Sequence, residues 1–482
     1  MYVRPQGVGE GDKPAPTPPK FVMKLVARLH PEMRRRNRSA AQAWAQKLWR
    51  TEVDHWFDVE RSEVIARNLA LQAVDLATLD NHELDLHIAD TLSHFGEQLR
   101  FNMSEHGGDM MPTGDLLAHC AHWGIDATIA MTLLDGSSPA TIETATMLAP
   151  LAQALEALAV QPTSVEEMRA MGSEVRDAID AWHSMHAWRL VTGDDVDSAT
   201  MAEMPVVQFA ALLVSSRPAT THAHAAATSN VRAQVPAADR PLFDELVGEA
   251  RYGHRQRDDV RGIRCNWPAG LIRRGLLEAG RRLVAAGALH EVSHVFELTP
   301  QEMNACLRGG RGPIADESGR RADFRNEIER LSPPRMLGDP EAPPMLDALP
   351  TAMARATEAM MMNLQFDATV RQTRPLHGVG IGDATYRGRA LVVNNDADAF
   401  DRIEAGDVLV AVCTGPSINA ILPLAGALVV EEGGPVCHAA IVAREFGIPA
   451  LVGTLNATTA IPDGAEVEVD PVAGVVRVLD TR

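Results

Sequence analysis

The segment around His438 constrains this chain more than any other part of its sequence. Gly433 and Gly434 precede the histidine, and an alanine-rich stretch follows it as far as Gly447 and Pro449. Glycine lets backbone amides approach an anion closely, because it has no Cβ. A helix beginning at His438 would point its unpaired N–H groups at the imidazole and would end at Gly447, since proline cannot continue it. The segment therefore predicts a histidine that becomes an anion, such as a phosphohistidine.

Taken alone, this pattern also fits an ordinary histidine at a helix N-terminus. The whole string from 433 to 449, however, resembles the active-site segment of the phosphohistidine swivelling domain of phosphoenolpyruvate (PEP)-utilising enzymes. That family includes PEP synthase, pyruvate phosphate dikinase, rifampin phosphotransferase and the phenylphosphate synthases. The resemblance implies that His438 is the covalent nucleophile. The residues that it implies for binding the phosphoryl group are Gly433, Gly434, Cys437 and Thr414.

Strand patterns on both sides of the histidine extend the resemblance. Short β-branched runs bounded by Gly, Asp and Pro predict strands. Residues 376–382 followed by 386–393 resemble the family's opening strand, 406–410 resemble its second strand, and 463–476 resemble its closing hairpin. Thr414 begins a Thr-Gly-Pro turn that fits the one after the family's second strand. Two positions depart from the family: Val430 stands where threonine is usual, and Cys437 stands where serine is commoner. Neither replaces the nucleophile, but the lost hydroxyls are expected to weaken the orientation of the phosphoryl group.

Length and composition set wider bounds. The chain has 482 residues, enough for two to four domains, and only 4% are aromatic, so alanine, leucine and valine must fill the cores. No apolar run approaches the roughly 18 residues of a membrane span, and the N-terminus lacks the apolar segment of a signal peptide. The net charge of −19 argues against a nucleic-acid or anionic-membrane surface. Five scattered cysteines without disulfide or zinc spacing favour the cytoplasm.

The pattern of apolar residues divides the chain into a helical and an α/β part. Residues 1–20 are rich in Gly and Pro and predict a disordered tail. The fold class that we expect is multidomain: a large, mostly helical acceptor-binding domain at 21–345, a hinge at 346–375 and an α/β swivelling domain at 376–482. Apolar residues at three- and four-residue spacing predict helices at 40–50, 60–77, 81–100, 165–190, 271–286 and 352–364. The alanine-rich stretch 219–229, with His222 and His224, is predicted to be a loop.

Arg257 and Arg261 form the best candidate site in the helical part. On a helix they share one face, and two guanidiniums on one face can grip a phosphoryl group with forked hydrogen bonds. A solvated face with ion pairs is the simpler interpretation of this segment alone. Residues 276–303, however, resemble a segment of the substrate-binding domain of rifampin phosphotransferase. In that domain an R-E-x-x-K motif lies before the segment, at about the distance that separates Arg257 from residue 276 here. The resemblance places Arg257, Asp258 and Arg261 on that motif. It implies two clamps and, at Asp258, a base or an arginine-orienting group, although arginine at the lysine position fixes the charge.

His119 and His122 lie three residues apart in a helix predicted at 115–123. Histidines with this spacing can bind a metal, but no third ligand has a distinctive spacing, so no metal site is expected. A place in the wall of a substrate pocket is the favoured interpretation.

Some expected parts of such an enzyme are not found in the sequence. There is no P-loop, no room for an ATP-grasp domain before the helical region, and no C-terminal TIM barrel of about 250 residues. By the resemblance, the chain is expected to be one subunit of an ATP-dependent phosphotransferase, as in a split phenylphosphate synthase. A separate ATP-grasp subunit would hold ATP and Mg²⁺ and load His438, and this chain would bind no cofactor tightly. A hydroxyl of a small organic molecule would then accept the phosphoryl group.

Two other classes of function remain open. One is a histidine phosphocarrier that PEP loads and that donates to a protein. The other is a non-catalytic helical binding protein whose swivelling domain is a relic.

Overall fold

The computed structural model describes the larger part of the chain. The described ranges are 29–105, 110–134, 139–158, 162–191, 195–216, 221–310, 315–329, 349–364, 376–393, 396–414, 421–434 and 437–480, with positions 21, 25, 137, 312, 313, 346 and 418. The predicted tail at 1–20 and residues 365–375 of the predicted hinge lie outside the described residues.

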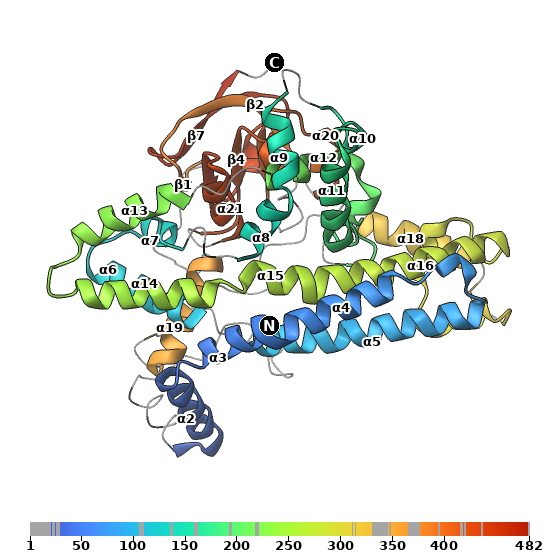
Figure 1. Ribbon diagram of the computed structural model, residues 1–482, viewed down its shortest axis with the longest axis horizontal. Coiled ribbons are helices and arrows are strands. Elements are labelled where there is room, and N and C mark those ends of the chain that lie inside the picture. Colours follow the sequence, from blue (N-terminus) through green and yellow to red (C-terminus); the bar gives the residue numbers. More distant parts are fainter. Residues whose placement is uncertain are drawn as a thin grey trace, which may run out of the picture.

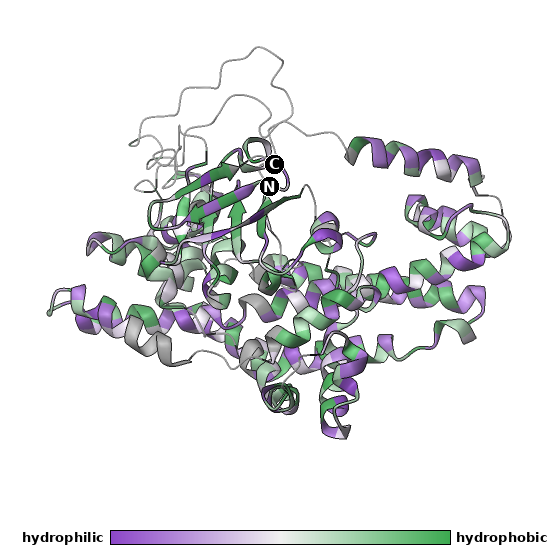
Figure 2. Cartoon of the chain, turned by 90° about the horizontal axis from the view of Figure 1, so that it is seen from above, coloured by the Kyte–Doolittle hydropathy of each residue, from purple (hydrophilic) through white to green (hydrophobic). Residues whose placement is uncertain are grey.

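The chain is mostly helical, and Figure 1 shows the C-terminal sheet above a layer of long helices. The helices alternate between hydrophobic and hydrophilic bands along their length (Figure 2), as amphipathic helices do. The α-helices before the sheet are α2 (Pro31–Ala45), α3 (Leu48–His55), α4 (Arg61–Gln72), α5 (Asn81–Glu105), α6 (Met110–His122), α7 (Ala127–Thr132), α8 (Pro139–Met147), α9 (Ala149–Glu156), α10 (Val165–Arg169), α11 (Ser173–His186), α12 (Pro205–Ser215), α13 (Thr221–Gln234), α14 (Arg240–His254), α15 (Arg257–Arg261), α16 (Trp267–Ala285), α17 (Pro300–Leu307), α18 (Ala315–Glu329) and α19 (Thr351–Leu364). Shorter segments are the π-helices η1 (Trp56–Glu60) and η4 (Gly262–Asn266) and the 3₁₀ turns η2 (Leu76–Thr78), η3 (Met201–Glu203) and η5 (Val292–Glu297). Among the described residues, no helix combines the length and the apolar character needed to cross a membrane.

The predicted helices are found with two breaks, one early end and one omission. The helix predicted at 60–77 ends at Gln72, and a separate 3₁₀ turn follows at Leu76–Thr78. Lys47 adopts a left-handed conformation (φ 48°) and separates α2 from α3 within the predicted helix 40–50. Gly172 (φ 155°) separates α10 from α11 within 165–190. The prediction of a loop at 219–229 is wrong, because helix α13 begins at Thr221. Alanine has the highest helix propensity, and the small size of these residues misled the interpretation.

Helices α14, α15 and α16 follow one another along nearly one line (Figure 1), with η4 between α15 and α16. The other π-helix, η1, packs against the junction between α15 and η4. The contact is an apolar cluster of Trp56, Val64, Val260 and Ile263. The carboxylate of the buried Asp259 accepts hydrogen bonds from Nε1 of Trp56 at 3.0 Å and from Nε of Arg61 at 2.6 Å. The junction is therefore fixed by both packing and a buried ion pair.

The C-terminal region forms one seven-stranded sheet in the order β1-β5-β4-β3-β2-β6-β7. Strands β2 to β5 are parallel, whereas β1, β6 and β7 pair antiparallel with their neighbours. The predicted opening strand proves to be two strands in different places, since β1 lies at the edge and β2 in the interior. The strands are β1 (Val379–Ile381), β2 (Tyr386–Val392), β3 (Val408–Ala411), β4 (Ala427–Val430), β5 (Ala450–Val452), β6 (Glu466–Asp470) and β7 (Val475–Asp480); the helices are α20 (Asp396–Arg402), α21 (His438–Phe446) and α22 (Ala457–Ala460), with a 3₁₀ turn η9 (Leu422–Leu424).

Both faces of the parallel strands are covered. One face, with Val408, Val410 and Val429, shares a cluster with α22 and with residues of β6 and β7. The other face, with Leu409 and Leu428, belongs to a larger cluster that includes α20 and α21. Burial on both faces explains why β3 and β4 are continuous apolar runs rather than alternating ones.

The larger cluster also contains residues of helices α9 to α12. Trp182 of α11 and Leu212 of α12 belong to it together with Phe400 and Ile421 of the sheet region, and α12 contacts η9. In this conformation, helices from the middle of the chain therefore share one apolar core with the C-terminal sheet.

Helix α19 occupies much of the region predicted to be a hinge. It packs against α6, and Nε of Arg355 donates to Asp115 of α6 at 3.1 Å. A Cβ at Gly114 would lie 2.0 Å from the carbonyl oxygen of Arg355, so the two helices are in backbone contact. Residues 351–364 are thus attached to the helical region.

We expect Gly114→Ala to separate α19 from α6 and to lower the free energy of unfolding by about 1–3 kcal/mol, as overpacking does. Hydrogen exchange over residues 351–364 should become faster. Gly96→Ala is the matched control, because its Cβ would meet nothing within 4 Å and alanine favours a helix by up to about 1 kcal/mol. Unchanged exchange over 351–364 in Gly114→Ala would contradict the tight contact.

Candidate functional site

His438 is the first residue of α21, as the sequence predicted. The helix ends at Phe446, and Gly447 adopts a left-handed conformation (φ 65°). The N–H group of Ile448 donates to the carbonyl of Ala443 at 2.8 Å, which closes the helix end. The imidazole therefore lies where the unpaired N–H groups of the helix are directed.

The sheet brings two further segments to the histidine. The carboxyl end of β4 leads into the glycine pair, and the carboxyl end of β3 leads to Thr414. Oγ1 of Thr414 lies 3.2 Å from Nδ1 of His438, within hydrogen-bonding distance. Ligand sites of α/β sheets form at the carboxyl ends of parallel strands, and His438 occupies such a position. Thr414, which sequence analysis selected, is thus brought to His438.

The loop before His438 requires glycine at position 433. Gly433 has φ 106°, and a Cβ there would lie 2.5 Å from Sγ of Cys437. The N–H group of Cys437 donates to the carbonyl of Gly434 at 3.0 Å, which closes a tight turn. Residues 435 and 436 of this turn lie outside the described residues.

Cys437 is buried and packs against the first turn of α21. Burial raises the pKa of its thiol, while backbone N–H groups of the turn and the charge of Arg444 act in the opposite direction. The side chain is therefore a neutral thiol at neutral pH. It occupies the position where the family usually has a serine hydroxyl.

Glu431 is a site residue that sequence analysis missed. Its carboxylate is buried, with the residue 3% exposed, and accepts the backbone N–H of Thr458 at 2.8 Å and the hydroxyl of Thr458. The bonds tie the start of the glycine loop to α22. The signal in the sequence was a charged residue directly after an apolar strand. A carboxylate buried at such a position is expected to have hydrogen-bond partners.

The structure gives only part of the predicted arginine site. Arg257, Asp258 and Arg261 form α15 with their neighbours, but the side chains of Arg257 and Asp258 lie outside the described residues. Arg261 is exposed. The buried acid of this helix is Asp259, which sequence analysis did not select. No described contact joins these residues to His438.

His119 and His122 lie on α6 near its contact with α19. Nδ1 of His119 is 2.8 Å from the carbonyl oxygen of Asp115, and the ring lies 5.8 Å from that of Trp123. His122 is exposed. Within the described ranges, no three His, Cys, Asp or Glu side chains are grouped in a way that could hold a metal ion.

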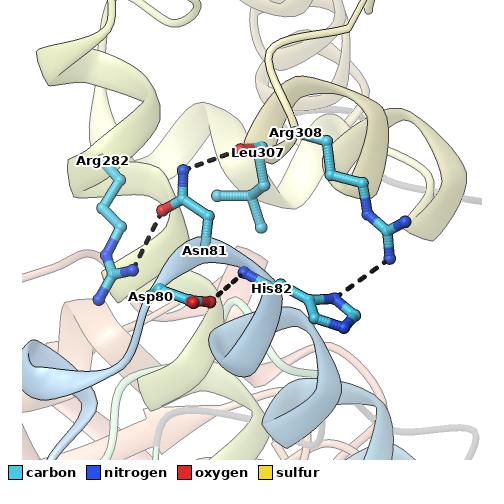
Figure 3. A pocket seen from close by; sticks show the side chains of 6 residues that line it. All are labelled: Asp80, Asn81, His82, Arg282, Leu307 and Arg308. Atoms are coloured by element: carbon cyan, nitrogen blue, oxygen red, sulfur yellow. Dashed lines mark hydrogen bonds between the residues drawn. The ribbon is translucent and has the colours of Figure 1, made fainter.

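An open pocket of about 600 Å³ lies at the N-terminus of α5 (Figure 3). Asp80 already accepts the backbone N–H groups of His82 and Glu83 there, each at 2.8 Å. None of the predicted site residues lines this pocket. Its lining residues are Asp80, Asn81, His82, Arg282, Leu307 and Arg308.

Comparison with known proteins agrees with the geometry of the C-terminal region. Residues 403–474 match the family described as PEP-utilising enzyme, mobile domain. Rifampicin phosphotransferase of Streptomyces sviceus is 29% identical over 340 residues, which cover 64% of this chain and 35% of the relative. The Bacillus subtilis rifampicin phosphotransferase is 26% identical over 322 residues, with the same coverages of 64% and 35%. An uncharacterised protein of Mycobacterium tuberculosis is 32% identical over 51% of this chain and 25% of its own length.

The chain spans about a third or less of the length of these curated relatives. The matched family segment contains Thr414, the glycine loop and His438. The chain therefore resembles the PEP-utilising enzymes, with their mobile domain at residues 403–474 and a wider similarity to the rifampicin phosphotransferases.

Proposed function

We propose that this chain is the phosphoryl-carrying and acceptor-binding part of an ATP-dependent phosphotransferase, with His438 as the phosphorylated residue. The position of His438 at the first residue of α21, beside the glycine loop and within the family segment, is the observation that carries the proposal. Backbone N–H groups and the helix dipole stabilise an anion there, which supports a phosphohistidine at this position.

The attacking atom in this proposal is Nε2 of His438. In this proposal Nδ1–H donates a hydrogen bond to Oγ1 of Thr414, which lies 3.2 Å away, and this bond selects the tautomer with a lone pair on Nε2. Nε2 forms a bond to phosphorus as the bond from phosphorus to the leaving oxygen breaks. In the second step an acceptor hydroxyl attacks the phosphorus, the N–P bond breaks and imidazole is regenerated. Catalysis then rests on positioning and charge stabilisation, with Asp258 as the proposed base for the hydroxyl proton.

The phosphoryl donor in this proposal is ATP, held with Mg²⁺ by a separate ATP-grasp subunit. Attack on the β-phosphorus releases AMP and leaves a pyrophosphoryl group on His438. Hydrolysis of its terminal phosphate then gives inorganic phosphate and the phosphohistidine. The relatives are about three times as long as the matched part, which leaves ample sequence for a donor unit. By their name, these relatives act on rifampicin. For this chain we propose the broader class of a hydroxyl on a small organic molecule.

With ATP and the ATP-grasp partner, the chain should gain an acid-labile, base-stable phosphate on His438. His438→Ala should abolish this phosphate, whereas the control His119→Ala should keep it. Labelling with ³²P and mapping of the modified residue by mass spectrometry measure both. Equal labelling of His438→Ala would reject the proposal, and labelling from PEP in place of ATP would favour the phosphocarrier.

Thr414→Val should slow the phosphorylation of His438, because the Nδ1 proton loses its acceptor. One hydrogen bond of this kind is worth about 0.5–1.5 kcal/mol, which corresponds to a roughly two- to tenfold lower rate. Thr414→Ser keeps the hydroxyl and should label at nearly the parental rate. The measurement is the single-turnover rate of labelling, and a parental rate in Thr414→Val would show that the contact does not select the tautomer.

Arg261→Ala should leave phosphorylation of His438 intact and slow transfer to the acceptor. Loss of a charge-assisted bond to the transferred group costs about 1.5–3 kcal/mol, or one to two orders of magnitude in rate. The control is Arg320→Ala, which removes an exposed arginine paired with Glu317. Transfer is measured as the loss of phosphate from His438 in the phosphorylated chain after the acceptor is added. Parental decay would assign Arg261 to a solvated ion-pair surface, worth at most about 1 kcal/mol of stability.

A further inference from the structure

A second arginine lies against the junction of α15 and η4. Arg189 follows α11, and its Nε donates to the carbonyl of Met185 at 3.0 Å. A Cβ at Gly262 would lie 2.7 Å from Nη1 of Arg189. The guanidinium therefore rests directly over Gly262, the first residue of the π-helical turn, and the missing side chain at that position makes room for it. Single π-helical turns occur frequently at functional sites.

The charge of Arg189 has no carboxylate within 4.0 Å among the described residues. Asp259 is the acid whose negative charge acts on Arg189. Its carboxylate already accepts hydrogen bonds from Nε of Arg61 at 2.6 Å and from Nε1 of Trp56 at 3.0 Å. Arg61 also pairs with Glu143 at 2.6 Å. Arg61 thus holds the carboxylate of Asp259, the one acid that acts on Arg189 within the described part of the chain.

Burial lowers the pKa of Arg189 to about 10, and Arg61 adds to this effect while Asp259 opposes it. The guanidinium still carries its proton at neutral pH. The side chain is half-buried, so its positive charge is partly desolvated and an anion would stabilise it.

Arg274 shows how a structural arginine is satisfied in the same fold. It too is partly buried, but its Nη1 and Nη2 donate to the carbonyls of Gln72 and Val74 at 2.7 and 2.8 Å. For Arg189, the part of the chain that the structure describes offers a partner for Nε alone, apart from the face of Trp267 at 5.9 Å. The two Nη groups form the fork that binds phosphate oxygens.

The position of Arg189 also suits a site on the acceptor side. Two residues further along, Val191 is buried in the apolar cluster that joins the helices to the C-terminal sheet. On its other side Arg189 lies against Gly262, which directly follows Arg261 at the end of α15. Arg189 thus lies between the sheet-bearing cluster and the helix that holds the predicted clamp.

We propose that Arg189 forms a phosphate-binding site over Gly262. Its ligand class is a phosphate dianion or the phosphoryl group of a phosphorylated molecule. The assignment of the transferred phosphoryl group as that ligand rests on the proposed function, whereas the existence of the site does not.

The test is calorimetric titration of the full chain with inorganic phosphate. The parent should bind phosphate at this site, and Arg189→Gln should lose one bound phosphate per chain or bind it roughly 10- to 100-fold more weakly, as expected for a charge-assisted bond. The control is Arg281→Gln, which removes an exposed arginine paired with Glu278 on α16 and should leave phosphate binding unchanged.

A second variant keeps the arginine and moves only its head group. Gly262→Ala places a Cβ against Nη1, the mobile end of a flexible side chain, so the fold should persist and alanine should suit the helical backbone. Phosphate binding should weaken in Gly262→Ala as well. If both variants keep the parental affinity and stoichiometry, or if the parent binds no phosphate, the site does not exist.

The same titration separates this inference from the proposed function. His438→Ala should bind phosphate over Gly262 like the parent, because His438 is not part of the site. A chain that labels on His438 yet shows no Arg189-dependent phosphate binding would overturn the site alone. A chain that binds phosphate through Arg189 but never labels would support the site and overturn the phosphotransferase.

Discussion

The apolar cluster that α9 to α12 share with the C-terminal sheet holds the two halves of the molecule in the arrangement described. Leu409 and Leu428 on the sheet and Trp182 on α11 lie in one continuous core. Such a core is stabilised by removing apolar surface from water, at about 25 cal/mol per Å². Any movement of the sheet away from these helices must re-expose that surface. The position of His438 relative to the helical region is therefore set by hydrophobic burial as well as by the connecting chain.

The helical side of this cluster is rich in methionine. Methionine is flexible and polarisable, and surfaces that bind in more than one arrangement often use it. A contact made by such side chains tolerates a change of partner better than one made by β-branched residues. This composition would suit the proposed carrier role, in which the sheet region contacts two different partners. The methionines on this side are Met147, Met168, Met171, Met201 and Met204.

The sequence predicted the surroundings of His438 well, because its signals there are local. Gly433, Gly447 and Pro449 act through backbone conformation, which depends on few neighbours, and the helix ends lie where they indicate. Side-chain partners from distant segments were harder to predict. Glu431 is paired with Thr458 and Arg189 lies over Gly262, and nothing in local pattern or periodicity relates these positions. The arginines of α15 remain a prediction from resemblance, since the one described side chain, that of Arg261, is exposed.

The attachment of α19 to α6 has a geometric consequence for any carrier motion. The helix ends at Leu364, and the sheet region begins at Leu376, so twelve peptide steps separate the two anchored points. A fully extended chain advances at most about 3.3–3.6 Å per residue, which limits the separation of these points to roughly 40 Å. Leu376 must therefore stay within a sphere of that radius about the end of α19. A donor subunit would have to present its nucleotide inside the volume that this tether, together with rotation of the domain, allows His438 to reach.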